Sequence, residues 1–421
     1  MKYSIVTFGC RVNQADSFEL EEQLIGAGGT ASSTQDADLV VVNTCSVTSS
    51  ADQGTRQIVR KIARENPQAR IVVTGCYATR RPDEVAALPG VVQIVPNDRK
   101  EWLAGEIGLT TAKRFGGGDG ACGAEIAPGL AGRTAFTLRV QTGCDQTCSY
   151  CIIPSTRGAG RSRPLHEVLS EIDRVRDAGY REIAITGVHL GSYGRDLVAG
   201  STLLDLLNAI ERHASELRFR ISSLEPMDCT DEIVDLVAAS TCFAPHFHLP
   251  LQHASDTMLV AMCRPYTLAY YRRLVDRIRE KIPHASIGTD IIVGFPGESD
   301  GDFAVLEAYL RDAPITHLHV FPYSDRPGTA AAELTDRVHG SIVRERARLV
   351  RAIGRELNRR FTDTQEGSVR PGLTIEDGSL VVTDNYLKVR IPPGHVRNER
   401  VSIVLTRNDG ALVGTVIESA R

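Results

Sequence analysis

The sequence predicts an α/β protein with a parallel α/β sheet domain, a full or partial β/α barrel and a small antiparallel β-barrel. Three observations predict this fold class. Continuous apolar runs alternate with helical stretches over residues 1–112, the alternation resumes over 134–362, and short strands with turn residues fill 363–421. Residues 113–133 are rich in glycine and lack hydrophobic periodicity, which predicts a flexible linker.

Composition excludes several classes of protein. Apolar residues make up 42% and charged residues 24% of the 421 residues, so the chain is neither mostly disordered nor collagen-like. The formal net charge of −4 means that any nucleic-acid surface must be a local patch. The sequence has no run of eighteen apolar residues and no signal-peptide core, so we expect a cytoplasmic protein without membrane contact. In that compartment, ten cysteines indicate metal or redox chemistry.

In the first domain, the apolar runs are unbroken, whereas a half-exposed strand would alternate apolar and polar residues. We expect strands at 3–8, 38–45, 69–76 and 91–96. Between them lie a helix that ends at Gly28 and a basic helix that runs to Arg64. Strands that are apolar on both faces and separated by helices are typical of a parallel sheet covered on both sides.

The second and third domains follow from the same patterns. Barrel strands are expected at 136–140, 182–188, 217–223, 247–252, 286–295 and 316–323. Helices are expected at 166–179, 268–282 and 342–361. Four short runs, at 379–384, 386–391, 401–406 and 411–417, predict the terminal barrel.

Three cysteines in eight residues form the most specific motif. Cys144, Cys148 and Cys151 have the spacing C-x3-C-x2-C and directly follow a predicted strand. Three thiolates on one loop can hold three irons of a four-iron cluster and leave the fourth open for a ligand. Barrel enzymes carry their active sites at the carboxyl ends of the strands, where this loop lies. The alternatives are buried structural cysteines or a zinc site that lacks one ligand.

A second set of cysteines is scattered along the first domain. Cys10, Cys45 and Cys76 each follow an apolar strand and one polar or glycine residue. The carboxyl ends of parallel strands meet at one edge of a sheet, where ligands of such sheets bind. One such cysteine would be ordinary core packing. Three at equivalent positions predict a second metal cluster with an open site.

Both sets together resemble the radical S-adenosylmethionine methylthiotransferase family. The matching stretches are TFGCRVNQADS, VVNTCSVT, VVTGCYA, QTGCDQTCSYCIIPSTRG, TGVHLGSYG, RISSLEP, HLPLQHASD, TDIIVGFPGE and FPYSDRPGT. TDNYLKV resembles part of the small RNA-binding barrel that ends these proteins. The resemblance implies a barrel of the radical S-adenosylmethionine type, two [4Fe–4S] clusters and S-adenosyl-L-methionine as cofactors. The first cluster then cleaves the cofactor to a radical that removes a hydrogen from an unreactive C–H bond, and the second presents sulfur.

The resemblance also assigns roles to single residues. Cys144, Cys148 and Cys151 become the catalytic cluster ligands, and Cys10, Cys45 and Cys76 the ligands of the second cluster. Expected contacts with the cofactor are Tyr150 near its adenine, Gly187 and Val188 through their backbone, and Ser222, Glu225, Gln252 and Asp290 through polar side chains. A plain βα turn, a helix N-cap and loop packing are the alternatives at these positions.

Substrate choice follows from finer sequence details. TFGCRVNQADS, NTCSVT and TGVHLGSYG look most like the branch that acts on threonylcarbamoyladenosine beside the tRNA anticodon. The prenyl-adenosine branch usually has Gln-Asn-Val at Val188–Leu190, and the branch that modifies a ribosomal-protein aspartate usually has Pro at Arg11. Both branches stay as alternatives, as does a non-catalytic iron–sulfur or zinc protein that binds RNA. The sulfur source and the electron donor are not identifiable from the sequence.

Two departures from the family pattern lie near the expected active face. His253 and Ala254 stand where Ser-Gly is usual, and Cys263 and Pro265 stand where Asn and another residue are usual. Cys263 is expected to be a hydrophobe, with a reactive thiol near the site as the alternative. The remaining cysteines have no partner spacing and are expected to be structural: Cys122, Cys229 and Cys242.

Three charged or polar features remain open. His246, His248 and His253 bracket one strand and are expected to be satisfied by hydrogen bonds, with metal ligation as the alternative. Arg157 is expected to meet a carboxylate or solvent. Residues 341–361 carry seven Arg against two Glu, which fits either a phosphate-binding face or the solvated side of a helix.

Overall fold

The computed structural model describes residues 1–109, 126–129, 133–198 and 200–420. They form two compact units. The first contains Met1–Ile126, Gln141–Arg161 and Asp325–Ala332, and the second contains Ala127–Val140, Ser162–Ser324 and Glu333–Arg421. Most of the predicted linker lies outside the described residues. The predicted domain limits stay predictions, but the cysteine loop at 144–151 groups with the N-terminal sheet.

A five-stranded parallel sheet forms the centre of the first unit; four of its strands match the predicted apolar runs, and the short β2 was not predicted. Its order is β2-β1-β3-β4-β5. The strands are β1 (Lys2–Thr7), β2 (Thr30–Ala31), β3 (Leu39–Thr44), β4 (Arg70–Gly75) and β5 (Val91–Val95). Every residue of β3 is buried, because this strand lies in the middle of the sheet with helices on both faces.

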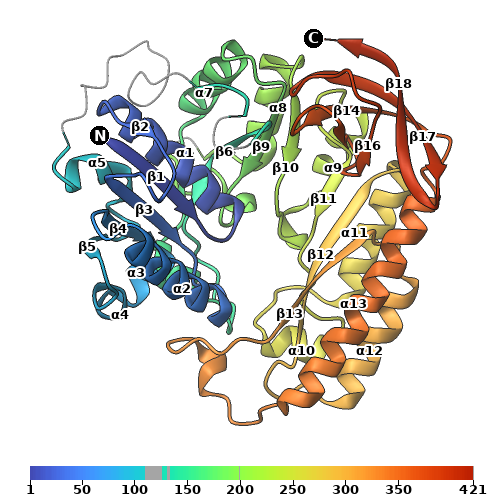
Figure 1. Cartoon of the computed structure of the whole chain (residues 1–421). Coiled ribbons are helices and arrows are strands. Elements are labelled where there is room, and N and C mark those ends of the chain that lie inside the picture. The colour runs from blue at the N-terminus through green and yellow to red at the C-terminus, as the bar shows by residue number, and fades with distance from the viewer. Residues whose placement is uncertain (110–125, 130–132, 199, 421) are drawn as a thin grey trace. The chain divides into compact units, whose positions relative to one another are not determined.

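Two apolar clusters attach the helices to the two faces of this sheet (Figure 1). On one face, Leu20 and Leu24 of α1 pack with Val41 and Val72. On the other face, Val59 of α2 packs against residues of β3 and β4. The helices are α1 (Arg11–Gly26), α2 (Ser49–Glu65), α3 (Cys76–Arg80), α4 (Pro82–Ala86), η1 (Lys100–Trp102) and α5 (Leu103–Glu106). The packing leaves the carboxyl edge of the sheet to the loops that carry the cysteines.

Two later segments complete the first unit. The first holds β7 (Gln141–Thr142) and α6 (Ile153–Arg157), and β8 (Arg161–Ser162) pairs with β7. The second, Asp325–Ala332, is fixed by Arg326, which donates to the buried carboxylate of Asp52 at 2.6 Å. Arg80 lies 3.6 Å from the same carboxylate. The unit is therefore discontinuous in sequence.

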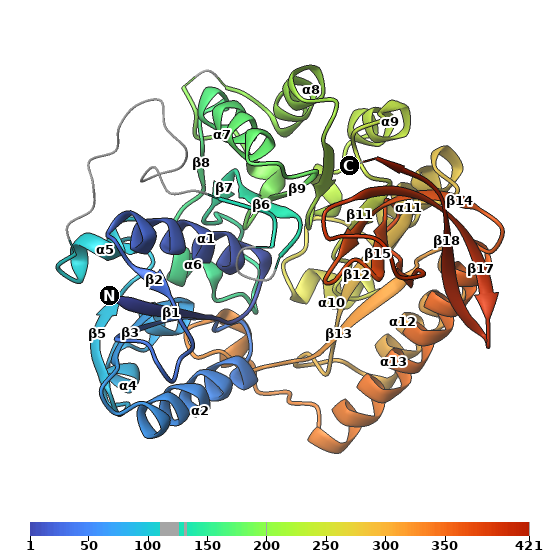
Figure 2. The same cartoon turned by 45° about the horizontal axis from the view of Figure 1, so that its top comes forward.

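Six parallel strands form a partial barrel in the second unit (Figure 2). They are β6 (Phe136–Arg139), β9 (Glu182–Thr186), β10 (Arg218–Ile221), β11 (His246–His248), β12 (Ser286–Val293) and β13 (His317–Pro322). The orders β10-β9-β6 and β11-β12-β13 describe two three-stranded sheets. Single bridges join them, Phe219 to Phe243 and Ser223 to His248. All six predicted barrel strands are present.

Amphipathic helices follow the barrel strands in sequence. They are η3 (Leu190–Ser192), η4 (Pro226–Asp228), η5 (Ala330–Glu333), α7 (Leu165–Asp177), α8 (Leu203–His213), α9 (Asp231–Ala239), α10 (Asp256–Ala261), α11 (Leu268–Lys281), α12 (Asp300–Asp312) and α13 (Gly340–Asp363). Capping boxes start α8 at Thr202 and α12 at Ser299. In the basic helix α13, several arginines form ion pairs with other residues of the protein. Arg346 binds the buried Glu298 at 2.7 Å, and Arg359 pairs with Glu356 at 2.7 Å. The arginine excess is thus partly structural.

The terminal strands close into a small barrel of the order β14-β15-β16-β18-β17. The strands are β14 (Val369–Ile375), β15 (Leu380–Thr383), β16 (Lys388–Arg390), β17 (Arg400–Asn408) and β18 (Ala411–Ala420). The expectation of a wholly antiparallel barrel was wrong in one respect, because β16 and β18 pair in parallel. β14 was not predicted, since Pro371 and Gly372 interrupt its apolar pattern.

Within the second unit, one buried arginine ties the terminal barrel to the partial barrel. Arg220 of β10 binds Glu182 through two hydrogen bonds and donates to the carbonyl oxygens of Thr383 and Asp384 at 2.7 and 2.6 Å. Within the described part of the chain, no helix is long and apolar enough to cross a membrane.

Candidate functional site

The structure places Cys10, Cys45 and Cys76 at the carboxyl ends of β1, β3 and β4, as predicted. Cys10 is the residue before α1, Cys45 follows β3 directly, and Cys76 opens α3. These strands are neighbours in the sheet. Burial raises the pKa of the Cys45 thiol to about 12, and the charges of Cys10 and Cys76 raise it further. The three thiols therefore lie close enough to interact electrostatically.

The second set, Cys144, Cys148 and Cys151, occupies the loop between β7 and α6 in the same unit. The backbone N–H of Cys144 donates to Gly158 at 3.0 Å, and that of Cys151 donates to Cys148 at 3.1 Å. These bonds fix the two ends of the cysteine loop. All three cysteines are half-buried, and none of them forms a disulfide.

Glycine is required directly before a cysteine in each set. Gly75 precedes Cys76 with φ +97°, and Gly143 precedes Cys144 with φ +74°. A Cβ at Gly75 would collide with the backbone of Thr44, and one at Gly143 with the backbone of Ala159. Backbone neighbours cannot move aside as a flexible side chain does, so both cysteines sit on backbone that only glycine tolerates.

The donor sets fit four-iron clusters better than single ions. Among the described residues, neither cysteine triad brings three sulfur atoms within the 4.8 Å expected around one ion. In a four-iron cluster each thiolate binds a different iron, so a wider spacing is required. Each triad also supplies three ligands and not four, which leaves one iron open.

A buried ionic network lies between the two triads. The carboxylate Oδ2 of Asp16 accepts from Lys100 Nζ and from Arg157 Nη2, both at 2.8 Å. All three side chains are at most 6% exposed. Burial lowers the pKa of Arg157, but the charges of Asp16, Cys76 and Cys10 outweigh it and leave the pKa raised. The predicted carboxylate partner of Arg157 is therefore Asp16, and the guanidinium stays cationic beside the thiols.

Amide side chains add direct links between the two cysteine segments. Asn97 donates to the carbonyl oxygen of Thr156 at 2.9 Å and lies 3.6 Å from the sulfur of Cys76. Asn13 accepts from Arg157 at 2.5 Å. Sequence reasoning assigned no role to Asn13, Asp16, Asn97 or Lys100. The only signal was that Asn13 and Asp16 belong to a stretch that matches the family.

The other predicted cofactor contacts fall mostly in the second unit. Gly187 and Val188 follow β9, Ser222 follows β10, and Asp290 lies on β12. Gly187, Val188 and Ser222 lie at the carboxyl ends of two neighbouring strands, where barrel enzymes bind ligands, whereas Asp290 lies within β12 of the other three-stranded sheet. The remaining three are Glu225, which pairs with Arg264, Gln252, which has φ +69°, and Tyr150, which lies in the first unit. Their contacts with a cofactor stay predictions.

Comparison with protein families and relatives agrees with this geometry. Residues 2–96 match the uncharacterized protein family UPF0004, and residues 138–310 match the radical SAM superfamily. A Bacillus subtilis relative named threonylcarbamoyladenosine tRNA methylthiotransferase MtaB is 34% identical, covering 91% of this chain and 88% of that protein. A Thermotoga maritima protein of the same name is 36% identical, covering 91% and 89%. The chain belongs to the radical S-adenosylmethionine methylthiotransferase family.

Other matches fit this methylthiotransferase assignment. A tRNA-2-methylthio-N(6)-dimethylallyladenosine synthase from Carboxydothermus hydrogenoformans is 33% identical, covering 87% of this chain and 86% of that protein. The solved radical S-adenosylmethionine methyltransferase TsrM from Kitasatospora setae superposes with a TM-score of 0.55 at 16% identity, covering 79% of this chain and 75% of that one. That likeness shows the shared fold. Family membership implies a [4Fe–4S] cluster and S-adenosylmethionine.

His246, His248 and His253, which bracket one predicted strand, do not come together as one group. His253, fully buried, accepts a hydrogen bond on Nδ1 from the backbone N–H of Ser255 at 2.9 Å. Its Nε2 lies 4.0 Å from Glu298. His246 and His248 lie on β11 instead. His253 is thus a core residue, fixed as the neutral tautomer that carries its proton on Nε2.

This buried histidine makes stability depend on pH. Burial lowers the pKa of His253 to about 4, and Arg346 lowers it while Asp302 raises it. An unfolded histidine titrates near pH 6.5. Between pH 6.5 and 4 His253 binds a proton in the unfolded state but not in the folded state. The free energy of unfolding therefore falls as the pH drops. We expect the histidine to cost about 2 kcal/mol between pH 7.5 and 5, and His253→Gln to remove this loss in urea unfolding followed by circular dichroism. His166→Gln, at an exposed site, is the control, and equal pH slopes in all three proteins would contradict the assignment.

The unmatched cysteines divide into buried and exposed positions. Cys229 and Cys242 are buried, as a structural role requires, whereas Cys122 lies outside the described residues. Cys263, expected to be a hydrophobe, is exposed and therefore no part of the core. It has φ +56° just after α10, a left-handed position that asparagine tolerates better than most residues. Its exposure therefore follows from its place at the end of a helix.

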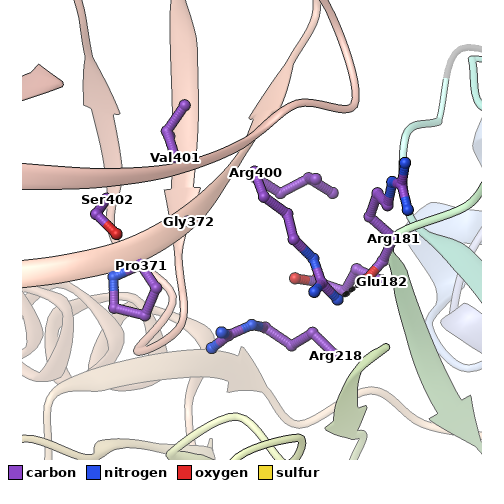
Figure 3. Close-up of a pocket in the computed structure, with 9 residues that line it drawn as sticks. Arg181, Glu182, Arg218, Pro371, Gly372, Arg400, Val401 and Ser402 are labelled. Carbon is purple, nitrogen blue, oxygen red and sulfur yellow. Dashed lines mark hydrogen bonds between the residues drawn. The ribbon is translucent and has the colours of Figure 1, made fainter. Parts of the chain in front are cut away.

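A pocket of about 210 Å³ lies in the second unit, between the terminal barrel and the starts of β9 and β10. Arg181, Arg218 and Arg400 are among the residues that line it (Figure 3). Glu182 also lines the pocket, but Arg220 occupies its carboxylate. Burial lowers the pKa of Arg400, and the charges of Arg218 and Arg181 lower it further. The pocket thus has an excess of positive charge that suits an oxyanion.

Proposed function

We propose that this methylthiotransferase inserts a methylthio group into the adenine ring of N6-threonylcarbamoyladenosine next to the anticodon of tRNA. The observation that carries the proposal is near-full-length similarity to relatives of that name, at 32–36% identity over 91–99% of the chain. Three relatives named for dimethylallyladenosine match 82–87% of the chain. The threonylcarbamoyl branch therefore has the better support.

The six cysteines would hold two clusters. Cys144, Cys148 and Cys151 are proposed to hold the [4Fe–4S] cluster that binds S-adenosylmethionine, and Cys10, Cys45 and Cys76 to hold a second one. When bound, these groups supply radical cleavage of the cofactor and the sulfur to be inserted, which no protein side chain can provide. The protein supplies ligands, orientation and charge.

The chain's own residues account for the positioning. The strained glycines fix Cys76 and Cys144 relative to their strands. Arg157 places a permanent positive charge beside Cys10 and Cys76, where it would offset the negative charge that iron-bound thiolates carry. Asp16 holds that guanidinium in place and offsets its burial.

The arginine pocket supports tRNA as the substrate. Arg181, Arg218 and Arg400 line a cavity together with Glu182. The carboxylate of Glu182 is already paired with Arg220. Arginine binds phosphate oxygens in a fork geometry, and backbone phosphates supply most of the affinity of a protein for nucleic acid. The local charge thus compensates for a chain that is acidic overall.

Mass spectrometry of tRNA nucleosides tests the proposal. We expect 2-methylthio-N6-threonylcarbamoyladenosine to disappear in cells that lack the gene, with unmodified N6-threonylcarbamoyladenosine left in its place. Plasmid-borne wild type should restore the nucleoside and Cys144→Ala should not. An unchanged tRNA profile would refute the substrate assignment, and a lost modification on a ribosomal-protein aspartate or a prenylated adenosine would reassign the chain to another branch.

A further inference from the structure

Three adjacent barrel strands bring two histidines and an aspartate together outside the cysteine sites. His248 ends β11, Asp290 lies within β12 and His319 within β13. β12 is the middle strand of the three, and Asp290 pairs directly with His319 in the register. His248 pairs with Gly288, two residues before Asp290 and on the same face of the strand. The three side chains therefore project from one face of the sheet.

Their ligand atoms form a nearly equilateral triangle. Oδ1 of Asp290 lies 3.1 Å from Nε2 of His248 and 3.1 Å from Nδ1 of His319. The two nitrogens lie 3.3 Å apart. Ligands about 2.0 Å from a tetrahedral zinc ion stand roughly 3.3 Å from one another. The triangle thus has the size of one face of a metal coordination sphere.

Hydrogen bonding alone explains this triangle poorly. If both nitrogens donate to the single Oδ1 of Asp290, two N–H groups meet at 3.3 Å and repel. If one nitrogen donates to the other, one of the two bonds to the carboxylate is lost. A cation at the centre of the face removes the conflict, since it binds all three lone pairs at once.

The surroundings resemble those of a metal site that a ligand can reach. The other ring nitrogen of His248, Nδ1, lies 3.1 Å from the hydroxyl of Ser223, a contact that fixes the ring so that Nε2 faces the triangle. The His248 side chain is 14% exposed, that of Asp290 24% and that of His319 54%. Three ligands on one face leave at least one position open to water or a substrate oxygen.

We propose that His248, Asp290 and His319 bind one divalent transition-metal ion of the zinc and ferrous-iron class. Two imidazoles and one carboxylate suit zinc and ferrous iron, which accept nitrogen ligands. They suit calcium and magnesium less well, because those ions prefer oxygen ligands. The site uses none of the six cluster cysteines and goes beyond the proposed function. It also gives Asp290 a ligand other than the predicted cofactor.

Anomalous X-ray diffraction on the holoenzyme, with its clusters assembled and zinc then added, tests the site. We expect a zinc-edge peak between the three side chains in wild type and in His166→Gln, an exposed-histidine control. Asp290→Asn and His319→Gln should lose that peak while the iron-edge peaks at the cysteines stay unchanged. His319 is half-exposed, so this second variant is expected to fold.

Metal content of the same proteins gives a second readout. The proteins are loaded with zinc, and unbound metal is removed by gel filtration. Wild type and His166→Gln should then contain one more zinc ion per chain than Asp290→Asn and His319→Gln. A wild-type crystal without a peak at the triad, after loading with zinc and separately with ferrous iron, would overturn the proposal. An equal zinc content in all four proteins would overturn it too.

Discussion

Cys10→Ala is expected to abolish methylthiolation and to leave the cleavage of S-adenosylmethionine intact. Cys10 belongs to the triad at the edge of the N-terminal sheet, whereas the cofactor is proposed to bind at the loop of Cys144, Cys148 and Cys151. Each triad has its own ligands, so the loss of one should spare the other. Liquid chromatography of 5′-deoxyadenosine and of modified tRNA nucleosides from one reaction measures both activities, and we expect at least a hundredfold loss in the second alone.

Two companion variants make this result decisive. Cys144→Ala should lose both activities, because cofactor cleavage precedes sulfur insertion. Cys263→Ala removes an exposed cysteine outside both triads and should lose neither. If Cys10→Ala stops cofactor cleavage while it retains the four irons of the other cluster, the proposed division between the two triads is wrong.

Asp16→Ala is expected to destabilise the first unit by about 3–5 kcal/mol, because it leaves two buried cations without their shared carboxylate. Lys100 and Arg157 both donate to Asp16 at 2.8 Å. Burial already lowers the pKa of Lys100, so that side chain can lose its proton when Asp16 is removed. Arg157 cannot, since a guanidinium stays charged in proteins. The uncompensated charge of Arg157 is the main source of the loss.

Hydrogen–deuterium exchange read by mass spectrometry measures this effect in each unit separately. We expect protection of the β3 amides to fall at least a hundredfold in Asp16→Ala, since 1.36 kcal/mol corresponds to a factor of ten. The β12 amides, in the second unit, should change little. Asp36→Ala, at an exposed position, is the matched control, and equal β3 protection in the two variants would show that the network contributes nothing.

Sequence patterns predicted the features that depend on local periodicity. The buried strands β3 and β4 are continuous apolar runs, and a residue that directly follows a parallel strand must lie at the carboxyl edge of the sheet. That rule alone placed Cys10, Cys45 and Cys76 together. The barrel strands and α13 followed from the same reasoning, and the spacing of Cys144, Cys148 and Cys151 predicted a shared loop.

Features that depend on distant partners could not be predicted in this way. Lys100 reads as an ordinary surface lysine until the fold brings it to Asp16, 84 residues earlier. The parallel pairing of β16 and β18 results from closure of the barrel, and no residue pattern within either strand indicates it. Nor does any pattern show that Asp325–Ala332 joins the first unit, since that depends on contacts with distant residues, such as the ion pair of Arg326 with Asp52 and the backbone bond of Ala331 to Ser149.

The discontinuity of the first unit has a consequence for its synthesis. A ribosome that adds about 5–20 residues per second needs on the order of 10 to 40 seconds to travel from residue 126 to residue 332. During that time Asp52 has left the ribosome before its partner Arg326 exists, and Asp16 waits likewise for Arg157. Until then the nascent segment has only Arg80 beside Asp52 and only Lys100 beside Asp16, so neither carboxylate has its full set of cationic partners. The first unit should accordingly reach its final packing only after translation has passed residue 332, late in the synthesis of the new chain.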